Sequence, residues 1–239
     1  SLNARIGWDD AAFGALVAAF PNTGFMGVPL LVALLGAGAA GPAIVTIVVD
    51  LVITTSLCVA LSRLDGADEH GAARAAKNAL KAVLANPMPW AISLGVVASA
   101  MSYELAGPLA KTVGLLADSA SPVALFTIGA VLARSQELTL ASDHEPMLMR
   151  DYVPIACFKL LLHPLLVLLV FSAVMQLGFA MDRFTMVVVV LVAALPSASN
   201  VALLTERFEA NTGRVAQIIL VTTVVAFFTF SAAVAVLHA

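Results

Sequence analysis

Two stretches of the sequence place proline and small polar residues inside otherwise apolar runs. The first reads AAFPNTGFMGVPLL and the second reads AALPSASNVALLTERF. Pro21 and Pro196 each remove an intrahelical hydrogen bond, so each run is expected to become two half-helices around an unwound centre. The half-helix that begins after each proline directs free N–H groups and about half a positive charge at the break. Such helix ends attract carboxylates.

Polar side chains at the two breaks are the candidate ligand-binding residues, because they can cap a half-helix or donate directly to a bound group. An organic anion is the expected ligand class. Asn22 and Thr23 could instead serve as caps alone. Ser197 and Ser199 could instead bond a carbonyl of the preceding turn. With Pro21 and Pro196 as the helix-breaking residues, the candidates are Asn22, Thr23, Gly24, Ser197, Ser199 and Asn200.

Four ionisable residues lie within predicted spans, where an unpaired charge is costly, so each is a candidate for function by default. Asp118 lies near the outer end of its span and is most simply a capping or interface residue. Asp50 could titrate or hold a cation. Lys159 and His163 are four residues apart and share a helix face, where they could neutralise a substrate carboxylate or pair with Asp50. The alternatives are a purely structural pair between Asp50 and Lys159 and a packing role for His163.

The composition identifies the solvent of this chain as lipid. Of 239 residues, 61% are hydrophobic and 11% are charged, with a mean hydropathy of +1.01, whereas soluble domains carry about 25% charged residues. A soluble domain of this size must cover its exterior with polar groups, which excludes a cytosolic enzyme. The net charge of −3 without a basic patch argues against nucleic-acid binding. Cys58 and Cys157 offer neither a disulfide nor a metal framework.

The sequence contains seven apolar stretches of about 20 residues, which is the length of a helix that crosses a bilayer. Helices are expected because the backbone in lipid must satisfy its own hydrogen bonds, and no barrel-like alternation occurs. The chain is therefore predicted to be an all-α membrane protein, with both prolines near the bilayer midplane. The predicted spans cover residues 11–35, 43–62, 87–104, 108–133, 151–178, 184–206 and 213–237.

Basic residues in short loops collect on the cytoplasmic side of a membrane. With a cytoplasmic N-terminus, the far side keeps only Lys111 and Arg183, and Lys159 lies inside a span. The segment 63–86 is therefore expected to be a cytoplasmic loop. The basic residues then on the cytoplasmic side are Arg5, Arg63, Arg74, Lys77, Lys81, Arg134, Arg150, Arg207 and Arg214.

Aligning the two proline motifs reveals an internal repeat, in which each broken span is followed by a short turn and another apolar helix. The first and sixth spans cross in opposite directions, so the repeat is inverted, as in many secondary transporters. The predicted organisation is the end of a first repeat at 1–62, the loop at 63–86 and a second repeat at 87–239. Three helices that would precede the first broken span are absent, so we expect an N-terminally incomplete copy.

Five motifs, in order along the chain, resemble the auxin efflux carrier family, which includes bacterial malonate permeases. The resemblance implies a ten-helix inverted-repeat fold shared with sodium-proton antiporters and bile-acid transporters, of which this chain would hold helices 4–10, with two broken crossing helices. It implies a permease for a small organic anion such as malonate or an auxin-like acid. The motifs are FPNTGFMGVPLL at 20–31, NPMPWAISLGVV at 86–97, LLADSASPVALFTIGAVLA at 115–133, KLLLHPLL at 159–166 and ALPSASNVALLTERF at 194–208.

The resemblance also implies a setting and partners. The expected location is the bacterial inner membrane, as a multi-pass protein in contact with lipid. A homodimer is expected through the scaffold helices, which are helices 1, 2, 6 and 7 of the ten-helix fold. No cofactor is expected beyond Na⁺ or H⁺ as a coupling ion. A sodium- or proton-coupled bile-acid-type symporter or antiporter of the same fold is the alternative.

The sequence argues against two other classes of membrane protein, a retinal-binding or receptor-type bundle and an intramembrane hydrolase. A retinal-binding bundle needs a lysine in its last helix, and residues 213–237 contain none. A receptor has no need of matching breaks at the midplane. An intramembrane hydrolase needs a nucleophile–base pair, an aspartate pair or HExxH, and the sequence offers no HExxH and no serine at helical spacing from His163 within its span.

Overall fold

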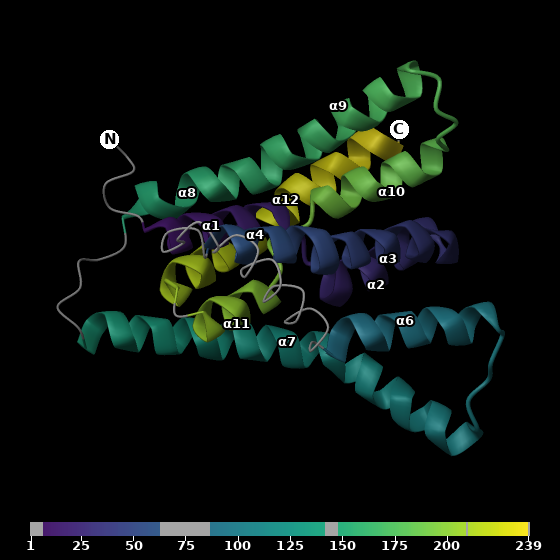
Figure 1. Cartoon of the computed structure of the whole chain (residues 1–239), viewed down its shortest axis with the longest axis horizontal. Coiled ribbons are helices and arrows are strands. Elements are labelled where there is room, and N and C mark those ends of the chain that lie inside the picture. The colour runs from purple at the N-terminus through teal and green to yellow at the C-terminus, as the bar shows by residue number, and fades with distance from the viewer. Residues whose placement is uncertain (1–6, 63–86, 142–147, 209, 239) are drawn as a thin grey trace, which may run out of the picture.

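The computed structural model describes residues 7–62, 87–141, 148–208 and 210–238, so the expected cytoplasmic loop at 63–86 lies outside the described residues. The described residues are predominantly helical (Figure 1). In chain order the α-helices are α1 (Trp8–Ala19), α2 (Val28–Leu35), α3 (Ala40–Val49), α4 (Thr55–Ser62), α6 (Pro87–Ala100), α7 (Gly107–Ala141), α8 (Met149–Cys157), α9 (His163–Gln176), α10 (Arg183–Ala193), α11 (Asn200–Arg207) and α12 (Thr212–His238). A 3₁₀ turn, η3 (Ala37–Ala39), and three π-helical turns, η2 (Thr23–Gly27), η4 (Asp50–Thr54) and η6 (Phe158–Leu162), join some of them.

Both proline motifs interrupt a helix. The first predicted span, 11–35, is divided into α1 and the continuous pair η2–α2, and the sixth, 184–206, is divided into α10 and α11. The span 151–178 is one uninterrupted rod of α8, η6 and α9. Pro154 and Pro164 do not interrupt that rod, so a proline within these spans breaks the helix where short polar residues follow it and offer other partners for the backbone.

The hairpin of α6 and α7 departs most from the predicted bounds. Helix α6 ends at Ala100 rather than 104, and Ser102 adopts a positive φ of 50° in the turn that follows. Helix α7 continues beyond the predicted limit of 133 to Ala141. The extension SQELTLA contains good helix formers, which continue a helix without needing an apolar environment.

Within the described residues, two helices are long and apolar enough to cross a membrane, Met149–Gln176 and Thr212–Leu237. Three shorter apolar helices are Thr23–Leu35, Ala37–Val49 and Arg183–Ala193. Division of the broken spans into short pieces accounts for part of the difference from the seven predicted crossings. The predicted count of seven is therefore not established by helix length alone.

Helices α6 and α7 form a diverging hairpin along one side of the molecule, and the other helices gather into a bundle (Figure 1). The bundle has two apolar clusters. One joins α1 to α11 and α12 through residues such as Leu16, Val201 and Ile218. The other joins α2 to α10 through Leu31 and Leu191. Each half of one broken helix thus packs with the opposite half of the other, so the interruptions lie where the two clusters meet.

Arg214, counted among the cytoplasmic charges above, is 8% exposed and joins three helix beginnings. Its Nε donates to the carbonyl of Asp151 at 2.9 Å and its Nη1 donates to the carbonyl of Asp10 at 3.2 Å. The Asp10 carboxylate in turn accepts from the N–H of Asn211 at 2.7 Å. The first turns of α1, α8 and α12 are therefore tied together at the same end of the bundle.

Candidate functional site

The two interrupted segments lie against each other as a short antiparallel pair. Pro21 and Ser197 face each other across an isolated β-bridge. The N–H of Asn22 donates to the Pro196 carbonyl at 2.8 Å, and the N–H of Ala198 donates to the Phe20 carbonyl at 2.9 Å. The two broken helices therefore cross in opposite directions and contact each other at their unwound centres. Each unwound segment therefore supplies hydrogen-bond partners to backbone groups of the other.

Ser197 completes this exchange with a side-chain bond. Its hydroxyl donates to the Val17 carbonyl at 2.7 Å. In a continuous helix that carbonyl would accept from residue 21, but Pro21 has no N–H. Ser197 thus supplies the missing donor from the other broken helix, rather than bonding the preceding turn of its own. This use fixes the geometry of the crossing and occupies the hydroxyl.

Thr222 of α12 supports the same point and was not anticipated from the sequence. It is fully buried, and its hydroxyl oxygen accepts from the Ser197 N–H at 3.2 Å. The same hydroxyl can donate to the carbonyl of Ile218 or Ile219 in its own helix. A threonine in an apolar helix usually bonds its own backbone, so no sequence signal distinguishes this role.

Three polar side chains at the crossing are left without partners. Asn22 is 4% exposed and Ser199 is 8% exposed, and neither side chain caps the half-helix that follows it. Among the described residues we find no hydrogen bond made by either side chain. The Oδ1 atom of Asn200 is buried and has no partner. Buried polar groups are normally paired, so these side chains make the crossing the candidate ligand site.

Thr23 and Gly24 occupy the first turn after Pro21 but differ in environment. Thr23 is 1% exposed, and its hydroxyl lies 3.5 Å from the Pro21 carbonyl oxygen. The Thr23 side chain therefore does not cap the first turn of η2. Gly24 is exposed, and a Cβ atom built there meets nothing within 4 Å. Gly27 is the close-contact position instead, because a Cβ atom there lies 2.5 Å from Leu195 Cδ1. Only glycine lets η2 approach the second break so closely.

Three candidate residues, Thr23, Asp50 and Lys159, lie in the π-helical turns η2, η4 and η6. Pro29 and Pro164 each follow a π turn by two residues, and neither can donate to the carbonyl four positions earlier, so the wider turn resolves the defect. In η4 the Thr55 hydroxyl donates to the Asp50 carbonyl at 2.9 Å. Such turns are frequent at functional sites, and sequence reasoning did not anticipate them.

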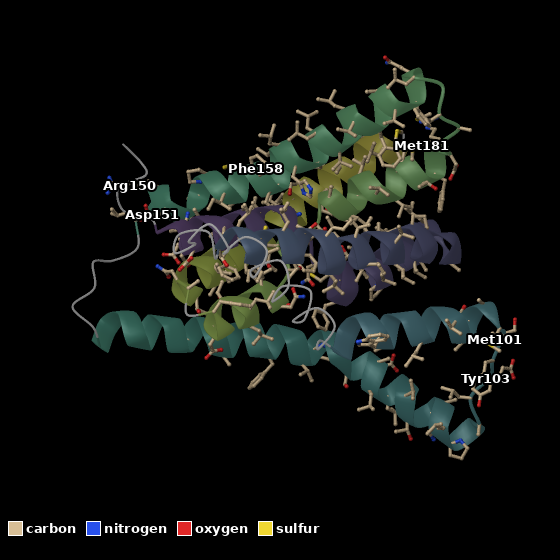
Figure 2. All side chains as sticks on the ribbon, in the orientation of Figure 1. Met101, Tyr103, Arg150, Asp151, Phe158 and Met181 are labelled. Carbon is tan, nitrogen blue, oxygen red and sulfur yellow. The ribbon has the colours of Figure 1, made fainter. Side chains whose placement is uncertain are left out.

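The structure brings Lys159 and His163 together as their spacing predicts. Lys159 is fully buried, and its Nζ lies 3.0 Å from Nδ1 of His163. Phe158, the preceding residue, is labelled on the outer side of the same rod in Figure 2 and is 41% exposed. The lysine therefore enters the bundle from a helix whose adjacent residue faces outward.

Asp50 lies within electrostatic reach of this pair. Its carboxylate interacts with the charge of Lys159, and its Oδ1 accepts from the Thr54 hydroxyl at 3.0 Å. The His163 ring also lies near enough to the backbone of Ala193, the last residue of α10, to interact with it electrostatically. The three ionisable candidates thus form one group that reaches the end of a broken helix.

Comparison with known proteins identifies the family of this chain. Residues 4–234 match the family described as membrane transport proteins, which is that of the auxin efflux carriers. The chain therefore belongs to this family of membrane transport proteins.

A relative from Rhizobium meliloti (strain 1021), named "Putative malonate transporter", is 28% identical to this chain over 220 residues. The similarity covers 92% of this chain and 65% of the relative. The chain thus spans less than two thirds of the length of that relative.

Proposed function

We propose that the protein is a secondary active transporter for a small organic anion, which binds by a carboxylate at the crossing of the broken helices. The observation that carries the proposal is the group of polar side chains without partners, Asn22, Ser199 and Asn200, at the beginnings of two half-helices. A bound carboxylate would supply an acceptor for the Asn22 amide N–H and the Ser199 hydroxyl. The unpaired Oδ1 of Asn200 is itself an acceptor and would take a donor, such as the O–H of a protonated carboxyl group.

The electrostatics of the crossing favour an anion. The carbonyls at the end of α1 and within the second break are paired, since those of Val17, Phe20 and Pro196 accept from Ser197, Ala198 and Asn22. The half-helices η2–α2 and α11 begin without a side-chain cap. The N-terminal end of each of these half-helices carries about half a positive charge and has no side-chain cap, whereas the carbonyls named above already accept hydrogen bonds. This asymmetry attracts a negative ligand.

Malonate is the first substrate to test, since the similar Rhizobium protein carries that substrate in its name. A dicarboxylate also suits the chemistry, because the crossing has two uncapped half-helix beginnings, each able to accept one carboxylate. Monocarboxylic auxins and bile acids provide the comparison, because the wider family resemblance implies anions of those kinds.

Transport would proceed by alternating access, with the broken helices moving as a unit. The backbone bonds that join the two breaks support this movement as a unit, because they hold the two broken helices to each other at their centres. The proposal includes an inverted repeat, a multi-pass arrangement in a bacterial inner membrane and a homodimer through scaffold helices. The antiparallel crossing at Pro21 and Ser197 supports the inverted repeat.

The test uses the full-length protein that carries this sequence, reconstituted in vesicles of phosphatidylethanolamine and phosphatidylglycerol. We expect uptake of radiolabelled malonate that exceeds uptake of indole-3-acetate and taurocholate. Asn22→Leu and Asn200→Leu should abolish uptake while the protein remains folded by circular dichroism. Gln176→Leu, which removes an exposed amide at the far end of α9, is the matched control and should transport normally. Unchanged uptake in both asparagine variants would refute the assignment of the site.

A further inference from the structure

We propose that Asp50, Lys159 and His163 form a proton-binding triad that couples transport to a pH gradient and that does not bind sodium. The inference rests on the proposed function and names the ion that drives it. Burying three ionisable side chains in an apolar bundle is unfavourable unless they are paired or functional. Asp50 and Lys159 lie in the π-helical turns η4 and η6, and His163 is the first residue of α9.

The group consists of one hydrogen-bonded pair of nitrogen atoms and one carboxylate that acts on the pair through its charge. Nζ of Lys159 and Nδ1 of His163 are 3.0 Å apart, which is hydrogen-bond distance. One proton therefore lies between two nitrogen atoms, with the Asp50 carboxylate within electrostatic reach of the lysine. Adding or removing one proton changes the charge of this group without requiring any other ligand.

The charge next to Asp50 argues against a sodium site. Sodium is a hard cation that takes several oxygen ligands, as Ca²⁺ does. Asp50 brings one carboxylate, already bonded to Thr54, and the charged group acting on it is the lysine. A metal ion at this carboxylate would be repelled by the Lys159 ammonium group, whereas a proton can exchange with it.

The remaining ionisable residues of the neighbouring helices lie mostly at helix ends. Helices α1, α8 and α12 pack against η6, and α3 and α4 flank η4. Of these groups, Arg214 is engaged with Asp10 and Asp151 at the far end of the bundle. By sequence the ionisable residues of the packed helices are Asp9 and Asp10 of α1, Arg150, Asp151, Tyr152 and Cys157 of α8, Arg214 and His238 of α12, Cys58 of α4 and Arg183 of α10.

The triad also has a direct route to the substrate site. His163 lies close to the backbone of Ala193, where α10 ends, and three residues later the Pro196 carbonyl accepts from Asn22. A change in the charge of His163 acts on the end of α10 through this proximity, and so acts on the crossing. Proton binding and anion binding are then linked, and linkage acts equally in both directions.

The proton balance of one cycle is simple. One proton from the aqueous phase forms an N–H or O–H bond in the triad as the anion binds on one side of the membrane. The same bond breaks on the other side, and proton and anion leave together. No other bond forms or breaks, and each proton carried offsets one negative charge of the substrate.

The test separates coupling from transport by two assays on the same vesicles. Exchange of radiolabelled malonate at equal concentrations and equal pH measures movement through the site without a driving ion. Net uptake is then measured with an acidic exterior, or with an inward sodium gradient, at a membrane potential held at zero by valinomycin and potassium. We expect the acidic exterior to stimulate net uptake about tenfold, within the usual range of coupling between sites, and sodium to have no effect.

Variants of the triad should lose the stimulation and keep the exchange. Asp50→Asn and His163→Gln are the single changes. The double variant Asp50→Asn/Lys159→Gln removes both charges together, so no unpaired buried charge remains to prevent folding. Asp118→Asn and Lys111→Gln, which change exposed residues of α7, are the controls and should retain the stimulation. A pH-indicator dye in weak buffer should also show proton uptake when malonate is added to the solubilised protein, and Asp50→Asn should abolish it.

The outcomes are distinguishable. Exchange with net uptake driven by sodium, or by neither gradient, overturns the inference and leaves the proposed function standing. Stimulation by acid that persists in Asp50→Asn, His163→Gln and the double variant also overturns it. The absence of exchange for every carboxylate in the unaltered protein overturns the proposed function, and the inference with it.

Discussion

The Ser197 hydroxyl donates a hydrogen bond of 2.7 Å to the Val17 carbonyl, from which it is separated by 180 positions in the chain. The bond exists because Pro21 cannot donate to the same carbonyl. It joins a defect in one broken helix to a polar residue in the other. The two helix interruptions are therefore one structural unit.

Removal of this hydroxyl should destabilise the crossing. Ser197→Ala leaves the buried Val17 carbonyl without its side-chain donor, which costs about 1–3 kcal/mol. We expect a lower thermal unfolding midpoint in detergent, measured by circular dichroism. Ser119→Ala is the control, because Ser119 is exposed on α7 and bonds only the Leu116 carbonyl of its own helix. Equal midpoints for the two variants would contradict this role of Ser197.

Thr222 and Thr223 offer a matched pair on α12. Thr222→Val leaves the buried Ser197 N–H without an acceptor, again at a cost of about 1–3 kcal/mol. Thr223→Val removes only a bond to the Ile219 carbonyl of the same helix and should have little effect. The unfolding midpoints of both variants and of the unaltered protein, measured in parallel, give the loss of stability in each variant. A larger loss in Thr223→Val would show that the contact between Thr222 and Ser197 contributes little.

Gly27 and Gly24 should respond differently to alanine. The added Cβ atom at position 27 would lie 2.5 Å from Leu195 Cδ1, and Leu195 is itself buried, so the core must shift at a cost of about 1–3 kcal/mol. The same change at position 24 meets nothing within 4 Å and should leave the unfolding midpoint unchanged. If a substrate lies against Gly24, Gly24→Ala raises the KM for malonate without loss of stability. Tolerance of Gly27→Ala would disprove the close approach.

Asp182 should make the stability of α10 depend on acid pH. It is the N-cap of this helix, and hydrogen bonds from the Thr185 hydroxyl and N–H and from the Phe184 N–H hold the pKa of its carboxyl below the ordinary value. A lowered folded-state pKa gives a contribution that is present above the unfolded pKa of about 3.9 and is lost as the pH falls through the folded pKa.

The variant Asp182→Ala should therefore unfold at a lower temperature than the unaltered protein at neutral pH, and the gap should narrow as the pH falls below about 4. Asp182→Asn is the control, because asparagine also caps helices but does not titrate. Thermal unfolding across this pH range provides the measurement. A gap between Asp182→Ala and the unaltered protein that stays constant with pH would rule out the titration as its cause.

Much of the architecture could be read from local chemistry. Proline within an apolar run predicts an interrupted helix at Pro21 and at Pro196, and the structure interrupts both helices there. The spacing of Lys159 and His163 predicts their contact. The predicted helix ends were less accurate, since α6 ends at Ala100 and α7 at Ala141. The residue at which a helix frays depends on weak conformational preferences.

The partners of the crossing could not be predicted in this way. Serine and threonine in apolar helices usually bond their own backbone, so nothing local marks Ser197 as a donor to Val17 or Thr222 as an acceptor. The π turns likewise depend on how a helix accommodates a missing donor, which several local geometries can do. The buried position of Arg214 follows from three helices that meet, while its sequence position resembles a solvated end.

The sequence by itself determined that this protein resides in lipid, that two of its helices are interrupted, and which polar and ionisable residues lie in apolar surroundings. These properties follow from composition and from the missing N–H of proline, which act within a few residues. Only the tertiary structure decided that the interruptions pair with each other and that Asn22, Ser199 and Asn200 keep unused polar groups. Hydrogen-bond partners across 180 positions depend on how the whole chain packs, which no local pattern encodes.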